Sequence, residues 1–323
     1  MRQVRRRHFL AAAGALLAAP RIALAQARSV RVGALGPRQG SLLLPPVLKR
    51  LGELGYVEGK NLTVEYRSAD GVAERFPSLA RELIQAKCDL IFSLGTEQSA
   101  RALLDEKSDI PVVILAMDFD PVKAGIVASY RRPGGNITGM YVSQSELAAK
   151  RLELLRELVP KAKRFLVLAD FFSKQQIDSV RQAAEKLRVD IVIETIAGPA
   201  LDFESAFASG RAAGIEALIV LLSPVFFDQR ARIFELAMKY RLPSAGFPPM
   251  FAEAGFLISY GVNPEAFGRA GEIAWNILNG ARPSELAVEQ PTQFDLVINL
   301  KTAKALGISI PGSIMMRADR VIE

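Results

Sequence analysis

Short apolar runs alternate with stretches of helical periodicity from Ser29 onward. Most of these runs are continuous, which is typical of strands in a parallel sheet with helices on both faces. Glycine and proline close several of them, as Gly36 and Pro37 close the first. The first series predicts strands at 30–35, 61–66, 90–94 and 112–116 and helices at 42–54, 74–86 and 97–106.

A second series of the same kind follows farther along the chain. Two series of similar length predict an α/β fold with two doubly wound, Rossmann-like lobes, each built on a parallel sheet. The connections inside such units are nearly always right-handed. This second series predicts helices at 145–158, 174–187, 203–213 and 226–240 and strands at 165–169, 191–196 and 217–222.

The stretch 120–141 lies between the two series and is expected to carry the chain from one lobe to the other. Pro121 favours a short helix after Asp120, because a proline at the first helical position loses no hydrogen bond. Pro133 and the two following glycines would end that helix. Residues 137–141 are rich in residues that favour strands.

The last third of the chain predicts two further crossings. Strands are expected at 255–261 and 294–298, on either side of a helix at 264–278, with a short helix at 300–306 after them. Three crossings form a hinge rather than a loose tether. The expected lobes are residues 28–139 with 262–292 and residues 140–261 with 293–323.

Residues 1–27 have the three parts of an export signal. Arginines precede an apolar run at 9–19, and small residues at 23–27 suit cleavage near residues 25–27. Arg6 and Arg7 fit the twin-arginine pattern, with the general secretory route as the alternative. The apolar run is shorter than the roughly 20 residues that span a bilayer. We therefore expect a mature protein in the periplasm.

The charge of the chain lies mainly in this signal. Its net charge of +7 comes from 41 basic and 34 acidic residues, and the signal contains five of the arginines and no acidic residue. The mature chain is nearly neutral, so the composition does not support a nucleic-acid partner.

Histidine and cysteine are too scarce for several kinds of site. The single histidine, His8, lies in the signal, so the mature chain has neither a Ser-His-Asp triad nor a histidine-ligated metal site. Cys88 is also alone, which prevents an internal disulfide and favours a buried core thiol. No catalytic residue, metal site or cofactor is expected.

Several motifs in order resemble one known family. They are LGYVEGKN at 54–61, DPV at 120–122, RPGGNITG at 132–139, LELL at 152–155, RARI at 230–233 and FDLVINLKTAKALG at 294–307. With these motifs the mature chain resembles the substrate-binding proteins of ABC transporters, of the group described as tryptophan/tyrosine-type, with a type I periplasmic-binding fold. The resemblance implies capture of a small-molecule ligand between two lobes and delivery to an ABC permease in the inner membrane. A monomer is the default expectation for that task.

The chain departs from the family pattern in two places. Phe119 stands before Asp120 where a small polar residue is expected, and Asp170 with Phe171 replaces an Asn-Pro pair. Both changes lie where the ligand is expected, so they leave its identity open.

The candidate site follows from a rule of open α/β sheets. Their ligands lie beyond the carboxyl ends of the strands, so the residues after each strand are the candidates. These candidates are Arg38, Gln39, Thr96, Glu97, Asp118, Phe119, Tyr141, Asp170, Phe171, Ser223, Phe247, Tyr260 and Gly261.

The polar candidates each have two interpretations. Thr96 and Ser223 precede helices, where a hydroxyl either helps to hold a ligand carboxylate or caps the helix. Arg38 suits a carboxylate through its planar guanidinium, or is a solvated loop charge. Asp118 suits a ligand amine, whereas Asp120 is expected to cap the turn at Pro121.

The aromatic candidates would together form an apolar wall, although aromatic residues at strand ends also fill cores. With one basic and several acidic or hydroxyl groups, such a wall favours an amino acid or a related organic acid as ligand. Trp275 is expected in a core.

Two other functions are alternatives to solute binding. A ligand-sensing subunit for a membrane partner is compatible with the same fold. An exported enzyme is disfavoured, because the chain lacks histidine and the G-x-S-x-G, P-loop and G-x-G-x-x-G signatures.

Overall fold

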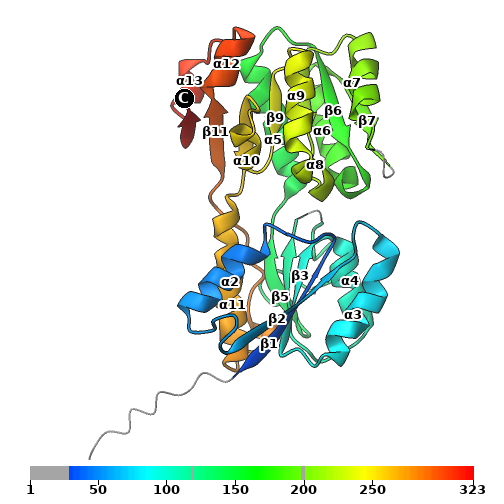
Figure 1. Cartoon of the computed structure of the whole chain (residues 1–323), viewed down its shortest axis with the longest axis vertical. Helices are drawn as coiled ribbons and strands as arrows, with labels where there is room; N and C mark the ends of the chain where they lie inside the picture. Colours follow the sequence, from blue (N-terminus) through cyan, green and yellow to red (C-terminus); the bar gives the residue numbers. More distant parts are fainter. Residues whose placement is uncertain (1–28, 118, 198–200) are drawn as a thin grey trace, which may run out of the picture.

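The computed structural model describes residues 29–117, 119–197 and 201–323. Its strands form two sheets, which correspond to the two series in the sequence. Figure 1 shows the resulting lobes one above the other along the long axis of the molecule. The expected signal at 1–27 lies outside the described residues.

Lobe 1 is built on five parallel strands in the order β2-β1-β3-β4-β5. All five strands lie within two residues of the ranges expected from the sequence. Their apolar side chains are buried on both faces, as continuous apolar runs require. The strands are β1 (Val30–Gly36), β2 (Leu62–Ser68), β3 (Leu90–Gly95), β4 (Val112–Ala116) and β5 (Ile137–Tyr141).

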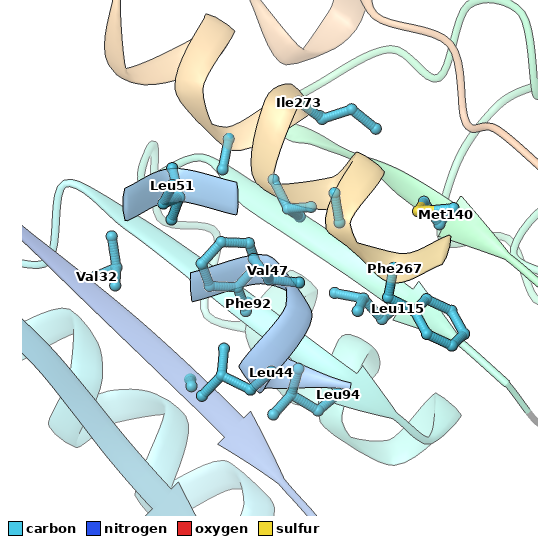
Figure 2. Close-up of a cluster of buried hydrophobic side chains, with 14 of the residues drawn as sticks. Val32, Leu44, Val47, Leu51, Phe92, Leu94, Leu115, Met140, Phe267 and Ile273 are labelled. Carbon is cyan, nitrogen blue, oxygen red and sulfur yellow. The ribbon is translucent and has the colours of Figure 1, made fainter. Parts of the chain in front are cut away.

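Helices α2 (Leu44–Glu53) and α11 (Gly268–Leu278) cover one face of this sheet. Figure 2 shows Val47 of α2 and Ile273 of α11 above Phe92 of the sheet. Each fully buried side chain of this size contributes about 1.5–3 kcal/mol. A late part of the chain therefore completes the first lobe. The other face packs against α3 (Phe76–Gln85), with η1 (Ala73–Arg75) before it, and α4 (Glu97–Asp105).

Lobe 2 contains seven strands in the order β12-β11-β10-β9-β8-β6-β7. Among the strands that the structure describes in this lobe, only β10 and β11 pair in antiparallel fashion. The chain leaves lobe 2 along β10 and returns along β11, so these neighbours run in opposite directions. The strands are β6 (Arg164–Ala169), β7 (Asp190–Thr195), β8 (Ala217–Val220), β9 (Ser244–Gly246), β10 (Ile258–Gly261), β11 (Asp295–Asn299) and β12 (Arg320–Ile322).

Helices also cover both faces of the lobe 2 sheet (Figure 1). One face packs against α5 (Gln144–Leu158), α6 (Lys174–Leu187), α12 (Leu300–Leu306) and α13 (Gly312–Met315). The other packs against α7 (Phe203–Ala212), α8 (Pro224–Asp228), α9 (Arg230–Lys239) and α10 (Met250–Glu253). Short 3-10 turns are η2 (Phe171–Ser173), η3 (Pro264–Phe267) and η4 (Pro283–Glu285).

The chain passes between the lobes three times, after β5, after β10 and before β11. The first and third passages are hydrogen-bonded, because Glu289 N donates to Gly139 O at 2.9 Å and Tyr141 N donates to Glu289 O at 2.9 Å. Asn263 Nδ2 donates to Asp295 Oδ2 at 3.0 Å and joins the second passage to the third. The three passages therefore form one hinge. The lobe boundaries expected from the sequence remain a prediction.

Two helices differ from the expectation. The helix expected after Asp120 is a turn that Gly125 ends at φ +67°, and Asp120 Oδ1 caps it by accepting from Val122 N at 3.0 Å. The helix expected at 226–240 is divided into α8 and α9, because Gln229 lies outside the helical region at φ −95°, ψ 9°.

Four short elements, β9, β12, α10 and α13, were not expected. In β9 the sequence Ser-Ala-Gly has no β-branched or aromatic residue, so it carries no strand signal of its own.

Candidate functional site

A cleft lies between the lobes, where the carboxyl ends of strands from both sheets meet. It encloses about 860 Å³, including the part open to solvent. Residues of both lobes and of the hinge line it. They are 37–43, 94–96 and Met117 from lobe 1, Phe172, 222–224, 227–228 and 247–248 from lobe 2, and Pro264 and Phe267 from the segment after β10.

Part of the expected site lines this cleft. These residues come from loops after β1, β3, β8 and β9, in agreement with the rule used on the sequence. They are Arg38, Gln39, Thr96, Ser223 and Phe247.

Thr96 both lines the cleft and caps α4. Gly95 has φ +85°, a conformation that favours glycine, and turns the chain from β3 into the helix. Thr96 Oγ1 then accepts from Ser99 N at 3.4 Å. The side chain is buried, and its hydroxyl proton is not needed for the cap. The two interpretations of Thr96 are therefore compatible.

Ser223 has the corresponding position in lobe 2. Its Oγ accepts from Val225 N at 3.0 Å and from Phe226 N at 3.4 Å, which caps α8. The same hydroxyl donates to the carboxylate of Asp170. The hydrogen bonds hold Ser223 in one orientation at the wall of the cleft.

Asp170 lies behind Ser223 and does not itself line the cleft. Its Oδ1 accepts from Phe172 N at 3.0 Å and from Ser173 N at 3.1 Å, so it caps η2. Burial raises the pKa of Asp170, while the hydrogen bond from Ser223 acts in the opposite direction. The structure thus connects Asp170 to the cleft only through Ser223.

Arg38 and Asp228 face each other across the cleft. Arg38 Nη1 lies 3.6 Å from Asp228 Oδ2, and the two residues come from different lobes. Sequence reasoning missed Asp228, because it expected one long helix there and no strand end. Gln39 is exposed beside Arg38.

Most of the aromatic residues that line the cleft are not the ones expected from the sequence. Phe247 lines the cleft as expected, together with Phe172, Phe227 and Phe267. The turn η2 directs Phe172 to the cleft and leaves Phe171 66% exposed, with the two rings edge to face at 5.5 Å. Of these two neighbours, Phe172 lines the cleft and Phe171 does not, so the contact of Phe171 with a ligand stays a prediction.

Three other expected aromatic residues are not among the residues that line the cleft. Phe119 is buried in the core of lobe 1. Tyr141 stacks on Tyr130, with ring centroids 5.9 Å apart. Tyr260 packs against Phe294 at 6.2 Å.

The remaining candidates are Glu97, Gly261 and Asp118. The first two have contacts inside the protein that account for them without a ligand. Glu97 pairs with Arg101 at 3.3 Å on α4. Gly261 makes room for the Phe247 ring, which would lie 2.1 Å from a Cβ atom at this position. Asp118 lies outside the described residues, so its contact with a ligand stays a prediction.

Arg151 of α5 is a further residue that sequence reasoning missed. Its side chain is fully buried behind the cleft wall, and its guanidinium lies 5.7 Å from the centre of the Phe247 ring. Nη1 donates to Tyr260 O at 3.1 Å, whereas Nε and Nη2 have no hydrogen-bond partner among the described residues. Burial lowers the pKa of Arg151 to about 9. In the sequence, nothing distinguishes Arg151 from the other charged residues of this helix, which is why it was missed.

Trp275 and Cys88 lie where the sequence predicts them. Trp275 packs at the edge of the lobe 1 core and donates Nε1 to Leu54 O at 3.1 Å. Cys88 is buried, which raises the pKa of its thiol to about 11. Neither residue lines the cleft.

Over the described ranges, no group of three or more histidine, cysteine, aspartate or glutamate side chains could hold a metal ion. No helix in this part of the chain is both long and apolar enough to cross a membrane.

Comparison with known proteins agrees with this geometry. The tyrosine-binding protein of Clostridioides difficile is 30% identical over 263 residues, which are 80% of this chain and 74% of that protein. A conserved domain protein of Vibrio cholerae has a crystal structure with TM-score 0.81 at 26% identity, covering 91% of this chain and all of that one. An ABC domain in complex with L-Trp from Streptococcus pneumonia has TM-score 0.79 at 24% identity with the same coverage, which supports the fold.

These structures are consistent with the type I periplasmic-binding fold, whose two α/β lobes are described above. The model of the ABC transporter substrate binding protein family matches residues 45–322, nearly all of the described chain. The chain therefore belongs to the ABC transporter substrate-binding protein family.

Proposed function

We propose that this protein is the extracytoplasmic binding component of an ABC importer and holds an amino acid or a related organic acid between its lobes. The observation that carries the proposal is the cleft lined by strand ends of both lobes. A ligand that contacts both walls favours the closed form over the open one, because it gains its full set of contacts only there. The closed protein then delivers the ligand to a permease in the inner membrane and acts as a monomer.

The cleft walls support a ligand with an apolar or aromatic side chain. Phe172, Phe227, Phe247 and Phe267 offer ring faces and edges, while Thr96 and Ser223 supply hydroxyl groups. The curated relative that is 30% identical is a tyrosine-binding protein, which points to the same class.

The residues that line the cleft also support a role in binding a ligand rather than in catalysing a reaction. Neither histidine nor cysteine is among the cleft residues that the structure describes. The Ser223 hydroxyl donates a hydrogen bond to the Asp170 carboxylate and accepts from two backbone N–H groups of α8, so it is held as a helix cap.

A thermal-shift screen tests the proposed ligand class. We expect one or more amino acids to raise the melting temperature, because a ligand that binds only the native state stabilises by about 2.7 kcal/mol at a concentration of 100 Kd. Aromatic acids, nucleosides and sugars form the comparison set. Stabilisation by a sugar or a nucleoside alone would show that the ligand class is wrong.

The export signal remains part of the proposal. We expect expression of the full chain in a Gram-negative host to give a periplasmic protein that starts after residues 25–27. Amino-terminal sequencing measures the cleavage point. Replacing Arg6 and Arg7 with lysine is expected to block export by the twin-arginine route, and unchanged export would indicate the general secretory route.

A further inference from the structure

The cleft contains one pair of opposite charges. Among its lining residues in the described ranges, Arg38 and Asp228 are the ones that carry a charge. Arg38 follows β1 in lobe 1, and Asp228 ends α8 in lobe 2. Their side chains are 38% and 52% exposed, so both are accessible to a solute that enters between the lobes.

The backbone around Arg38 is fixed. Tyr66 Oη donates to Arg38 O at 2.5 Å, and Gly71 N donates to Pro37 O at 2.8 Å. The guanidinium lies beside Gly71, where a Cβ atom would be in van der Waals contact with Nη2 at 3.5 Å. The loop after β1 therefore presents Arg38 to the cleft in a defined position.

The guanidinium of Arg38 has unused donors. Its Nε is buried and has no hydrogen-bond partner within the described chain. The 3.6 Å from Nη1 to Asp228 is longer than the 2.7–2.9 Å of a charge-assisted hydrogen bond. A carboxylate that approached Arg38 would gain hydrogen bonds that Asp228 does not make.

A cation is favourable beside Asp228. It lies in the last turn of α8, where the carbonyl end of the helix disfavours a negative charge. Arg38 is its only ion-pair partner among the described residues. An ammonium group is the ligand chemistry that suits this carboxylate.

We propose that Arg38 and Asp228 select a zwitterion: the guanidinium binds the ligand carboxylate and Asp228 binds the ligand ammonium. This inference rests on the proposed function, because it takes the same cleft as the ligand site. An amino acid satisfies both residues when the lobes close. The des-amino acid leaves Asp228 without a cation, and the decarboxylated amine leaves Arg38 without an anion, and each such loss is costly in a closed site.

The test uses sets of three probes that share one side chain: the amino acid, its des-amino acid and its decarboxylated amine. One set is L-tyrosine, 3-(4-hydroxyphenyl)propanoate and tyramine, and corresponding sets are made for the other amino acids. Calorimetry on the wild-type protein is expected to show at least one amino acid that binds on the order of 30-fold more tightly than its des-amino acid and its amine.

Two variants assign this preference to the two residues. Asp228→Asn is expected to remove most of the preference over the des-amino acid, because the amino acid loses its ammonium partner and the des-amino acid no longer leaves a carboxylate without a cation. Arg38→Gln is expected to remove most of the preference over the amine. Asp190→Asn is the matched control, because Asp190 pairs with Arg164 at 3.3 Å, lies outside the cleft and should leave both preferences unchanged.

The outcomes separate this inference from the proposed function. An amino acid that binds tightly, with its preference unchanged in Asp228→Asn, would overturn the zwitterion pair and leave the amino-acid binding protein intact. Equal affinity for all three members of every set would also overturn it. If des-amino acids bind and no amino acid does, the pair is wrong and the proposed ligand class stands. If none of the probes binds, both are wrong. Melting curves of each variant show that it is folded.

Discussion

Replacing Gly139 with alanine is expected to lower the free energy of unfolding by more than about 4 kcal/mol, a loss of a size that only severe defects produce. Gly139 lies in β5 at φ +143°. A Cβ atom there would lie 2.1 Å from Ile114 O and 2.6 Å from Ile114 N. Both are backbone atoms of β4, so no rotamer change removes the overlap. Chemical denaturation of the wild type and the variant measures the loss.

Gly280→Ala is the control for this prediction. Gly280 also has a positive φ, +102°, but no atom lies within 4 Å of its Cβ position. The cost there is expected to be only the left-handed backbone penalty of about 1–2 kcal/mol. Equal losses at the two positions would contradict the overlap between β4 and β5. A larger loss at Gly139 would show that the hinge strand depends on this close approach.

Replacing Arg151 with methionine is expected to raise the free energy of unfolding by about 1–4 kcal/mol, the gain known for buried ion pairs that give way to apolar residues of similar size. The guanidinium is fully buried with one hydrogen bond, to Tyr260 O, and two nitrogens without a partner in the described structure. Its contact with the Phe247 ring offsets part of the desolvation cost. Methionine fills the space without this cost.

The pH dependence of this stability gain tests whether desolvation of the buried guanidinium causes it. Burial lowers the pKa of Arg151 to about 9, below its value in the unfolded chain. Below that pH both states bind the proton and the full penalty acts; above it the folded protein releases the proton first, so the penalty decreases. The stability gain of Arg151→Met should therefore be constant below pH 9 and become smaller at higher pH.

Two further variants complete this test. Arg181→Met, at an exposed pair with Asp178 on α6, is expected to change stability by no more than about 0.5 kcal/mol. Arg151→Ala should be less stable than Arg151→Met, because it leaves a cavity. A loss of stability in Arg151→Met would show that the contacts with Tyr260 and Phe247 outweigh desolvation.

Much of the fold could be predicted because its signals are local. Continuous apolar runs identified β1, β3 and β4, and helical periodicity identified α5 and α6. The prediction was weaker where an element depends on its neighbours. The short strand β9 forms because β8 and β10 hold it on both sides. The division between α8 and α9 depends on a single residue whose backbone leaves the helical region.

Residues of the cleft could be predicted where they come directly after a strand in the sequence. Thr96 and Ser223 were predicted because each stands between a strand and a helix, and both line the cleft. Phe171 was chosen in place of Phe172, because the orientation of a side chain after a strand depends on the turn that follows. Asp228 and Arg151 lie on helices, and only the packing of whole elements brings them to the cleft or behind its wall.

Two α/β lobes, three crossings and a family could be inferred from the sequence alone, since apolar patterning, turn residues and ordered motifs are properties of neighbouring positions. Which side chains form the cleft depends on how the elements pack in three dimensions. Arg38 and Asp228 are far apart in the chain and meet across two lobes, and Arg151 loses its water only when α5 packs on the sheet. Such contacts depend on the directions of elements in space, which local sequence does not contain.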